Sequence, residues 1–218
     1  MKNSRFIHTQ AFILIALLSL VYFACDDAGI GPPKPRPFII AGTVAGWTPQ
    51  SNALVAQAVS ISGGPYTLAS SSIDTGGNFG FFPPQVDEST LFPTDSIFNL
   101  VCNSGPASFA PPNAKGTVIS SFAVINGSQP IGYIDCNNYN QSDPRKAGDF
   151  DVIYVFVNEN VAGNGFRLCG NDTVAVYGTA QLGWNKIFRV YKRIDPGSTT
   201  IVYYNSSFVG ATWKYHSY

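Results

Sequence analysis

The chain has 218 residues, with 13 acidic and 13 basic side chains and a formal net charge of zero. This balance argues against a nucleic-acid partner, because phosphate binding needs a basic excess on one face. Hydrophobic residues make up 45% of the sequence, which is too many for a disordered chain. Charged residues make up only 12%, and the abundant Phe, Tyr, Gly and Pro are typical of strands and turns.

Residues 1–24 have the layout of a secretory signal peptide. Lys2 and Arg5 form a short positive region, and an uncharged apolar run follows from Ala11 to Ala24. This run is shorter than the roughly 20 residues that a membrane-spanning helix needs. We therefore expect residues 1–24 to form a signal helix that directs export from the cytoplasm.

The apolar run ends at Ala24-Cys25, and here the chain resembles the bacterial lipoprotein signal, in which a small residue precedes an invariant, acylated cysteine. The resemblance implies that Cys25 begins the mature protein and carries the lipid anchor. Tyr22 departs from the pattern, which usually has Leu, Val or Ile there. Asp26-Asp27 resemble a surface-export signal of one Gram-negative phylum, but also an inner-membrane retention signal of enteric bacteria. We favour an outer-membrane lipoprotein of the cell envelope, exposed at the surface.

Residues 25–37 are expected to form a tether between the anchor and a folded domain. Four prolines occupy six positions from Pro32 to Pro37, which excludes helix and favours an extended polyproline conformation. At about 3.1 Å per residue the tether would reach roughly 35 Å. That length would hold the domain clear of the lipid head groups.

From residue 38 onward the sequence predicts short strands separated by turns, the first four at residues 38–44, 53–59, 66–69 and 78–82. This region resembles transthyretin-like and carboxypeptidase-regulatory-like β-sandwich modules. Those modules carry Gly-x-Val, an Ala-x-Val strand and Asp-x-x-Gly-x-Phe-x-Phe. The matching pieces are Gly42-Thr43-Val44, Ala53-Leu54-Val55 and Asp74 to Phe81. The resemblance covers roughly residues 38–82 and implies a non-catalytic sandwich module without site residues.

Further strands are expected at residues 96–102, 116–125, 130–135, 149–157, 173–177, 186–193, 199–204 and 211–215, with a polar loop at 136–148 and a turn at 158–165. The strand at 149–157 is apolar on both faces, which indicates a central strand covered on both sides. No helix of normal length is expected after the tether. Strands at this spacing are typical of a sandwich or barrel. We predict an all-β domain over residues 38–218, an antiparallel β-sandwich of transthyretin-like or immunoglobulin-like type.

The cysteines allow one disulfide in the exported domain. If Cys25 is lipidated, Cys102, Cys136 and Cys169 remain, and the odd number leaves one unpaired. The extracytoplasmic compartment permits disulfides. The expected strand directions favour Cys102–Cys169. A zinc site is not expected, because no C-x-x-C pair is present and His216 is the only histidine of the mature chain.

The polar loop offers the one candidate metal site. Its oxygen-bearing candidates are Asp135, Asn137, Asp143, Asp149 and Asp151. Such a density of oxygen ligands is typical of a calcium site, although the spacing is not that of an EF-hand. The alternative is a polar loop rich in turns. No other cofactor is predicted.

Catalytic residues are scarce. A Ser-His-Asp hydrolase would have to use His216, which lies almost at the C-terminus. A carboxylate pair for glycoside hydrolysis would draw on Asp149, Asp151 and Glu159. Trp47 and Trp184 each follow a Gly and either stack on a ligand or close the ends of the core.

We therefore expect a cell-envelope lipoprotein that acts as a non-catalytic structural or binding module. Its membrane contact would be the lipid anchor, and its partner a protein assembly or a glycan. The first alternative is a secreted carbohydrate-active enzyme. The second is a subunit of an extracellular filament that exchanges a strand with its neighbour, which an unpaired apolar edge strand would favour.

Overall fold

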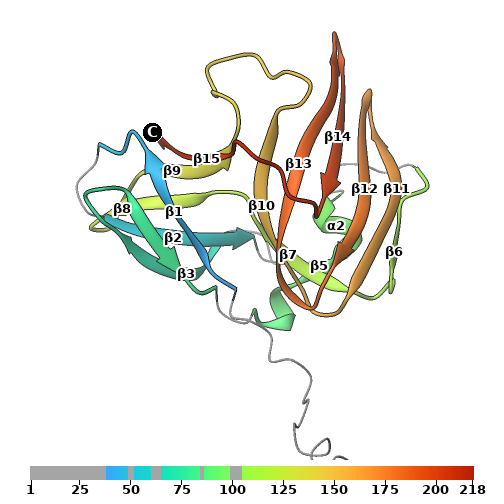
Figure 1. Cartoon of the computed structure of the whole chain (residues 1–218). Helices are drawn as coiled ribbons and strands as arrows, with labels where there is room; N and C mark the ends of the chain where they lie inside the picture. Colours follow the sequence, from blue (N-terminus) through green and yellow to red (C-terminus); the bar gives the residue numbers. More distant parts are fainter. Residues whose placement is uncertain (1–37, 49–51, 60–64, 84–85, 99–104) are drawn as a thin grey trace, which may run out of the picture. The chain divides into compact units, whose positions relative to one another are not determined.

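The computed structural model describes residues 38–48, 52–59, 65–83, 86–98 and 105–218 (Figure 1). The expected signal helix, the tether, Cys25 and Cys102 lie outside these ranges. The fold is all-β, as predicted, with 62% strand and 4% helix. Within the described ranges, no helix is both long enough and apolar enough to cross a membrane.

Seven strands close into a barrel, which lies on the left in Figure 1. The barrel strands are β1 (Ile40–Ala45), β2 (Asn52–Val59), β3 (Pro65–Ile73), β4 (Asn78–Phe81), β8 (Phe122–Asn126), β9 (Gln129–Asn137) and β15 (Thr212–Ser217). Their order is β15-β1-β4-β3-β2-β8-β9, and a pairing between β9 and β15 completes the circle. The pairs are antiparallel except β1 with β15, which is parallel.

The closed barrel differs from the predicted sandwich of two facing sheets. The difference comes from the parallel pairing of the two end strands, in which Val44 lies opposite Trp213. Turn signals between neighbouring strands predict hairpins, but they carry no information on a pairing between strands so far apart in the chain. The sequence therefore predicted the positions of the strands better than the way in which these strands close into a barrel.

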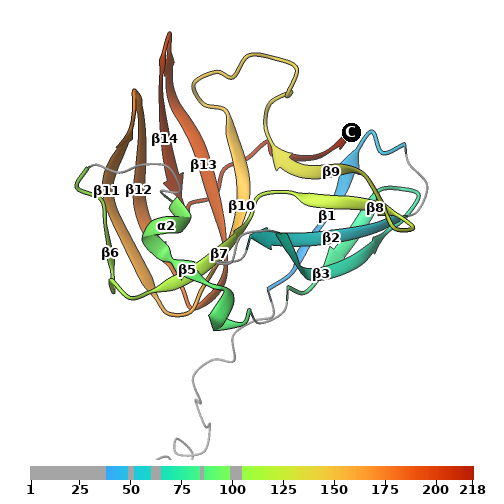
Figure 2. The ribbon, with the colours of Figure 1, turned by 180° about the vertical axis from the view of Figure 1, so that it is seen from behind.

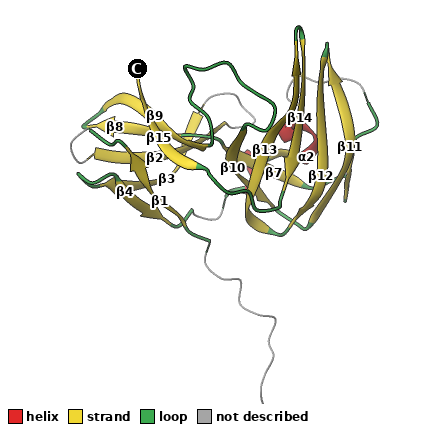
Figure 3. Cartoon of the chain, turned by 45° about the horizontal axis from the view of Figure 1, so that its top comes forward, coloured by secondary structure: helices red, strands yellow, loops and turns green. Residues whose placement is uncertain are grey.

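A second, curved part of the sheet continues from the barrel through β10 (Phe150–Val157), as Figure 3 shows. Asp151 and Val152 pair with β9, and residues 154–157 pair with β7 (Lys115–Ile119). On the other edge of β10 follow β13 (Gly183–Asp195), β14 (Ser198–Tyr204), β12 (Asp172–Ala180), β11 (Val161–Cys169) and β6 (Ser108–Ala110).

Short elements complete this part and are seen from behind in Figure 2. Strand β5 (Phe92–Pro93) pairs with β7, and the five-residue helix α2 (Thr94–Phe98) follows it directly. A 3-10 turn, η1 (Glu88–Thr90), precedes them. The buried hydroxyl of Thr94 donates to the carbonyl of Ala114 at 2.6 Å, which fixes the start of α2 against the chain before β7.

Strand β10 is central, as its sequence predicted, and all eight of its residues are buried. Phe150, Val152 and Tyr154 face the larger core, which fills the barrel. Ile153 and Val155 face a second core on the other side of the strand. One strand therefore separates two cores, which explains why both of its faces are mostly apolar.

Three of the expected elements are wrong in detail. Residues 94–98 form α2 where a strand was expected from residue 96, and the expected strand 116–125 is interrupted between β7 and β8. The expected turn at 158–165 belongs largely to β11. Its Gly163 does not mark a turn but a close approach, because a Cβ there would lie 2.6 Å from Cγ1 of Val176.

Candidate functional site

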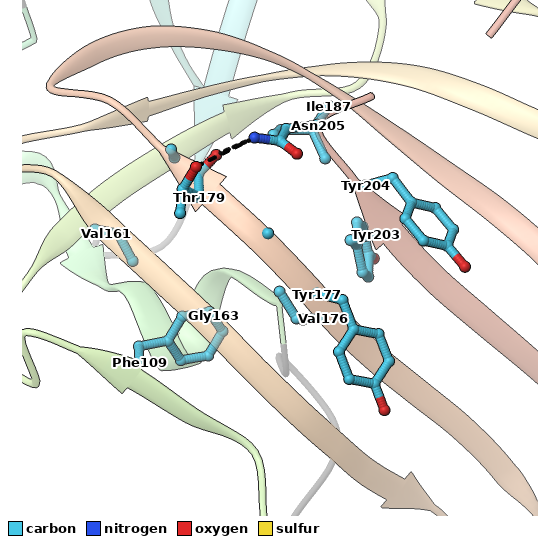
Figure 4. Close-up of a pocket in the computed structure, with 12 residues that line it drawn as sticks. Phe109, Val161, Gly163, Val176, Tyr177, Thr179, Ile187, Tyr203, Tyr204 and Asn205 are labelled. Atoms are coloured by element: carbon cyan, nitrogen blue, oxygen red, sulfur yellow. Dashed lines mark hydrogen bonds between the residues drawn. The ribbon is translucent and has the colours of Figure 1, made fainter. Parts of the chain in front are cut away.

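The candidate site is a pocket in a fork of the curved sheet, drawn in Figure 4. Strand β14 lies between β12 and β13, and it ends at Tyr204. Its pairing with β12 ends at Val176 opposite Tyr203, and its pairing with β13 begins at Phe188. Beyond these points β12 and β13 are not separated by a strand, and residues of both strands line the pocket together with residues of β6 and β11.

We call this site the fork pocket. It is lined by Phe109, Val161, Gly163, Val176, Tyr177, Gly178, Thr179, Ala180, Ile187, Tyr203, Tyr204 and Asn205. The run from Val176 to Ala180 is continuous, although successive side chains of a strand point to opposite faces of the sheet. The pocket therefore follows β12 along five residues, and its lining extends to Val161 and Gly163 of the neighbouring strand β11.

The walls are apolar and aromatic. Val161 and Ile187 belong to the second core, and Phe109 and Tyr203 pack against it. Burial raises the pKa of Tyr203, so this ring stays neutral. Tyr177 is 47% exposed and stands at the rim. The lining contains no charged side chain and no histidine or cysteine.

Asn205 supplies the polar contact at the pocket. Its Nδ2 donates to the carbonyl of Thr179 at 2.7 Å and approaches the Thr179 hydroxyl at 3.3 Å, as the dashed lines in Figure 4 show. The side chain thus satisfies an edge carbonyl of β12 that a longer β14 would otherwise pair with. This contact also fixes the direction of the Asn205 amide.

A second cluster lies at the base of the loop between β9 and β10, and we call it the polar junction (Tyr139, Arg145, Asp151, Arg189 and Tyr191). The buried carboxylate of Asp151 accepts from Nη2 of Arg189 at 2.7 Å and from Nε at 2.8 Å. Tyr139 donates a short hydrogen bond to Asp151, and Arg145 lies 3.5 Å away. The guanidinium of Arg145 lies between the rings of Tyr139 and Tyr191, at 4.3 and 4.4 Å.

The ionisation states at this junction follow from burial and charge. Burial and the hydrogen bond to Asp151 raise the pKa of Tyr139. Burial lowers the pKa of Arg189, but the charges of Asp151, Tyr191 and Tyr203 and the hydrogen bond to Asp151 together outweigh burial and raise that pKa above the usual value. Asp151 is therefore held between cations as a structural counterion.

The structure separates the five candidate calcium ligands into local contacts. Asp135 accepts from Asn137 and Gln141, both at 2.8 Å. Asp149 accepts from the backbone N–H of Lys146 at 2.7 Å, Asp143 makes a long contact with Asn140, and Asp151 belongs to the polar junction. In the part of the chain that the structure describes, no three His, Cys, Asp or Glu side chains are placed to share a metal ion. The calcium site gains no geometric support.

The two tryptophans pack at the margins of the cores. Trp47 meets Tyr215 edge-on at 5.2 Å between ring centroids. Trp184 meets Phe156 at 5.5 Å in a similar arrangement. Both rings are half-buried and pack against the barrel core. Their positions favour the interpretation that the two rings close the ends of the core. A role as platforms on which a ligand stacks is less favoured.

Cys169 is disulfide-bonded, and Cys136 is a buried free thiol. Burial raises the pKa of Cys136 to about 11, which keeps it protonated and inert at neutral pH. Cys102 lies outside the described residues. The pairing Cys102–Cys169 therefore stays a prediction.

The structure places His216 in a contact between two strands, and Glu159 at the far end of β10 from Asp151. His216 lies 3.0 Å from Asp135 and stacks on Tyr133, so it joins the end of β15 to β9. Glu159 follows the far end of β10, and the strand from Asp151 to Val157 alone spans roughly 20 Å. That separation exceeds the roughly 5–10 Å between the carboxylates of a glycosidase.

Sequence reasoning missed the fork pocket. Asn205 lies between the expected strands 199–204 and 211–215, and Tyr177 is the last residue of the expected strand 173–177. The pocket depends on β14 lying between β12 and β13, a strand order that no local sequence signal reveals. A polar residue directly after a strand was the one available hint, because such residues cap exposed backbone groups.

No protein-family model matches the chain, and no curated protein and no solved structure matches it.

Proposed function

We propose that this protein is a lipid-anchored protein of the bacterial cell envelope, whose β domain is a non-catalytic binding module. The fork pocket carries the binding part of the proposal. Its lining has apolar and aromatic walls and an oriented amide, but no charged or thiol group that would favour chemistry over binding. The ionisable groups of the polar junction are engaged with one another, which favours a structural role.

The envelope part of the proposal rests on the N-terminal sequence. The positive region, the apolar run and Cys25 follow in the order of a lipoprotein signal, and a proline-rich tether follows them. The proposal places the domain on the outer membrane, facing outward. The disulfide at Cys169 is consistent with an oxidising compartment.

The likeness of residues 38–82 to transthyretin-like modules remains part of the proposal. Its motif residues have structural positions that support it. The Asp74 carboxylate accepts from the backbone N–H groups of Gly76 and Asn78 at 2.9 and 2.8 Å, which builds the turn before β4. Phe79 and Phe81 then enter the barrel core. Such a segment would form part of the scaffold and would not contribute residues to a binding site.

The test is metabolic labelling with a clickable palmitate analogue, followed by protease shaving of intact cells. We expect label on the wild type and its loss in Cys25→Ala. Cys136→Ala is the matched control, because this buried thiol should not be acylated, and it should keep the label. Shaving of the labelled protein from intact cells would support surface exposure. Label retained in Cys25→Ala would contradict the anchor.

A further inference from the structure

One face of the curved sheet is covered, and the opposite face is open. Nη2 of Arg167 on β11 bonds to Asp95 of the short helix α2 at 2.7 Å, so α2 lies on the face to which Arg167 points. Figure 2 shows α2 in front of that face, and Figure 1 shows the sheet from the opposite side. Because successive side chains of a strand alternate, Phe166 and Leu168 point away from α2. They are 37% and 44% exposed.

We call this exposed side of β11, β12 and β14 the open face. The residues that matter on it are Asn164, Phe166, Leu168, Thr173, Tyr177 and Tyr204. The strand register places Asn164 opposite Tyr177, and Leu168 opposite Thr173. Tyr177 and Tyr204 directly follow the last paired residues of β12 and β14, and Figure 4 shows their rings on the same side of these strands.

Three of these residues place aromatic rings in a row across the three strands. Tyr204 and Tyr177 lie on neighbouring strands, which are roughly 4.8 Å apart. Phe166 lies opposite Ala175 and is therefore the diagonal neighbour of Tyr177, at about 7–8 Å. Tyr177 is 47% exposed, and Tyr204 is half-buried. The row spans roughly 12 Å of sheet surface, which suits a short stretch of a linear polymer.

The open face carries no charge of its own. The two charged residues of its strands, Arg167 and Asp172, belong to the other side of the sheet. There Asp172 accepts from the backbone N–H of Thr199 at 2.6 Å. Lys192 of β13 borders the face, with its Nζ 5.6 Å from the ring centroid of Tyr204. A neutral ligand therefore fits the face itself.

Polar groups interrupt the apolar residues of the open face. Asn164 lies beside Tyr177, and Thr173 lies beside Leu168. This alternation is not typical of a protein interface, whose buried centre is mainly apolar. A sugar ring with equatorial hydroxyls has two apolar C–H faces and a hydroxylated rim. Such a ring can pack a C–H face on exposed aromatic side chains and hydrogen-bond its rim to amide and hydroxyl groups.

The fork pocket at the margin of this face is too small for a ring. It encloses about 30 Å³, and a single water molecule already needs roughly 10–15 Å³. Two residues of its lining, Tyr177 and Tyr204, belong to the open face as well. A ligand larger than water would therefore lie on the open face, across the rim of the pocket.

We propose that the open face binds a neutral polysaccharide whose sugar rings carry equatorial hydroxyls, as in a β-linked glucan. The sugar rings pack on Tyr204, Tyr177 and Phe166, and Asn164 and Thr173 bond to the hydroxyls. This inference rests on the proposed function, since it names a ligand class for the binding module.

The test is isothermal titration calorimetry on the full chain carrying Cys25→Ala, which removes the proposed acylation site. Cellohexaose is the probe, because all of its ring hydroxyls are equatorial, and we expect it to bind. Hexagalacturonate is the comparison ligand, with a carboxylate on every ring and axial linkages. It should bind at least about ten-fold more weakly, because its carboxylates gain no ion pair from the open face and its rings lack a regular C–H face.

Three variants and one control locate the binding. Phe166→Ser and Tyr177→Ser each remove an exposed ring and should weaken cellohexaose binding about ten-fold. Tyr177→Phe retains the ring and should keep most of the affinity. Phe82→Ser is the matched control: Phe82 is 62% exposed, follows β4 in the barrel, and lies outside the open face, so binding should be unchanged. Circular dichroism verifies that each variant is folded.

Two results would overturn the inference. One is cellohexaose that fails to bind the parent protein, or that binds Phe166→Ser and Tyr177→Ser as tightly as the parent. The other is a dimer, detected by light scattering, that Tyr177→Ser dissociates, because the open face would then bind a second copy of the chain. Since neither measurement depends on acylation, failure here is distinguishable from loss of the lipid anchor in the labelling experiment.

Discussion

At the scale of single residues, the barrel depends on Gly42, a position at which the structure leaves no room for a side chain. Gly42 on β1 lies under the indole ring of Trp213 on β15, and a Cβ there would lie closer than 3.0 Å to Nε1 and Cδ1 of that ring. Trp213 in turn meets Phe79 edge-on at 4.9 Å and Phe122 at 5.6 Å between ring centroids. The ring cannot move aside without disturbing the centre of the core.

Gly42→Ala should therefore destabilise the protein by about 1–3 kcal/mol through overpacking. Gly80→Ala is the control on the neighbouring strand β4, where the new Cβ would make an ordinary contact with Ala41 at 3.4 Å. This control should be neutral or slightly stabilising. Urea unfolding followed by tryptophan fluorescence measures both variants. Equal stability of Gly42→Ala and the wild type would show that Trp213 has room to shift.

At the scale of elements, the polar junction holds the loop between β9 and β10 against β13. Gly148 donates its N–H to the carbonyl of Tyr191 at 2.8 Å, and Tyr191 donates to the carbonyl of Asp149 at 2.8 Å. Arg145 then extends from the loop into the space between two tyrosine rings. The loop base is thus held by backbone pairing, an ion pair and ring contacts together.

Asp151→Asn should destabilise the protein by about 3 kcal/mol, the lower end for a broken buried ion pair, because it removes the buried counterion of Arg189, whose own side chain is 31% exposed. Asp195→Asn is the matched control. It breaks the exposed Arg193–Asp195 pair and should cost less than about 1 kcal/mol. Thermal unfolding monitored by circular dichroism compares the two. A small effect of Asp151→Asn would indicate that water replaces the lost charge contact.

Elements with a strong local pattern were predictable from the sequence. The apolar run of β10 predicted a central strand because both of its faces meet a core. The glycines of β11 gave the wrong prediction of a turn, since Gly163 serves close packing against Val176. The fork pocket was beyond prediction, because it depends on the order β13-β14-β12 and on where β14 ends. Local patterns carry propensity and burial, but not the order of strands in a sheet.

At the scale of the whole domain, the described strands leave little open edge. The barrel is closed, which removes its edges altogether. The curved part ends in β6, with three residues, and in β5, with two. Edges this short are a common protection against pairing with other chains. Strand β6 pairs with residues 162–164 of the nine-residue β11 only, so strand exchange in a filament, one of the functions considered from the sequence, would use the remaining outer edge of β11, which carries the exposed Phe166 and Leu168.

The closure of the barrel makes the last strand essential to the fold. Strand β15 pairs with β1 on one side and with β9 on the other, and it carries Trp213 into the core. Deletion of residues 212–218 should open the barrel along two strand edges and abolish cooperative unfolding. Deletion of Tyr218 alone is the control, because the pairing register of β15 ends at Ser217. Thermal unfolding and size-exclusion chromatography measure both truncations.

Deletion of residues 212–218 should have this effect because β15 pairs with β1, a strand that lies far away in the chain. Residues 40–45 and 212–217 lie far apart in the chain, so their pairing costs loop-closure entropy and is not supported by contacts between neighbouring residues. Without β15, the aromatic rings of the barrel core would face solvent. The truncated chain should therefore aggregate or remain partly folded. A monomer that still unfolds cooperatively would show that β1 and β9 close the barrel on their own.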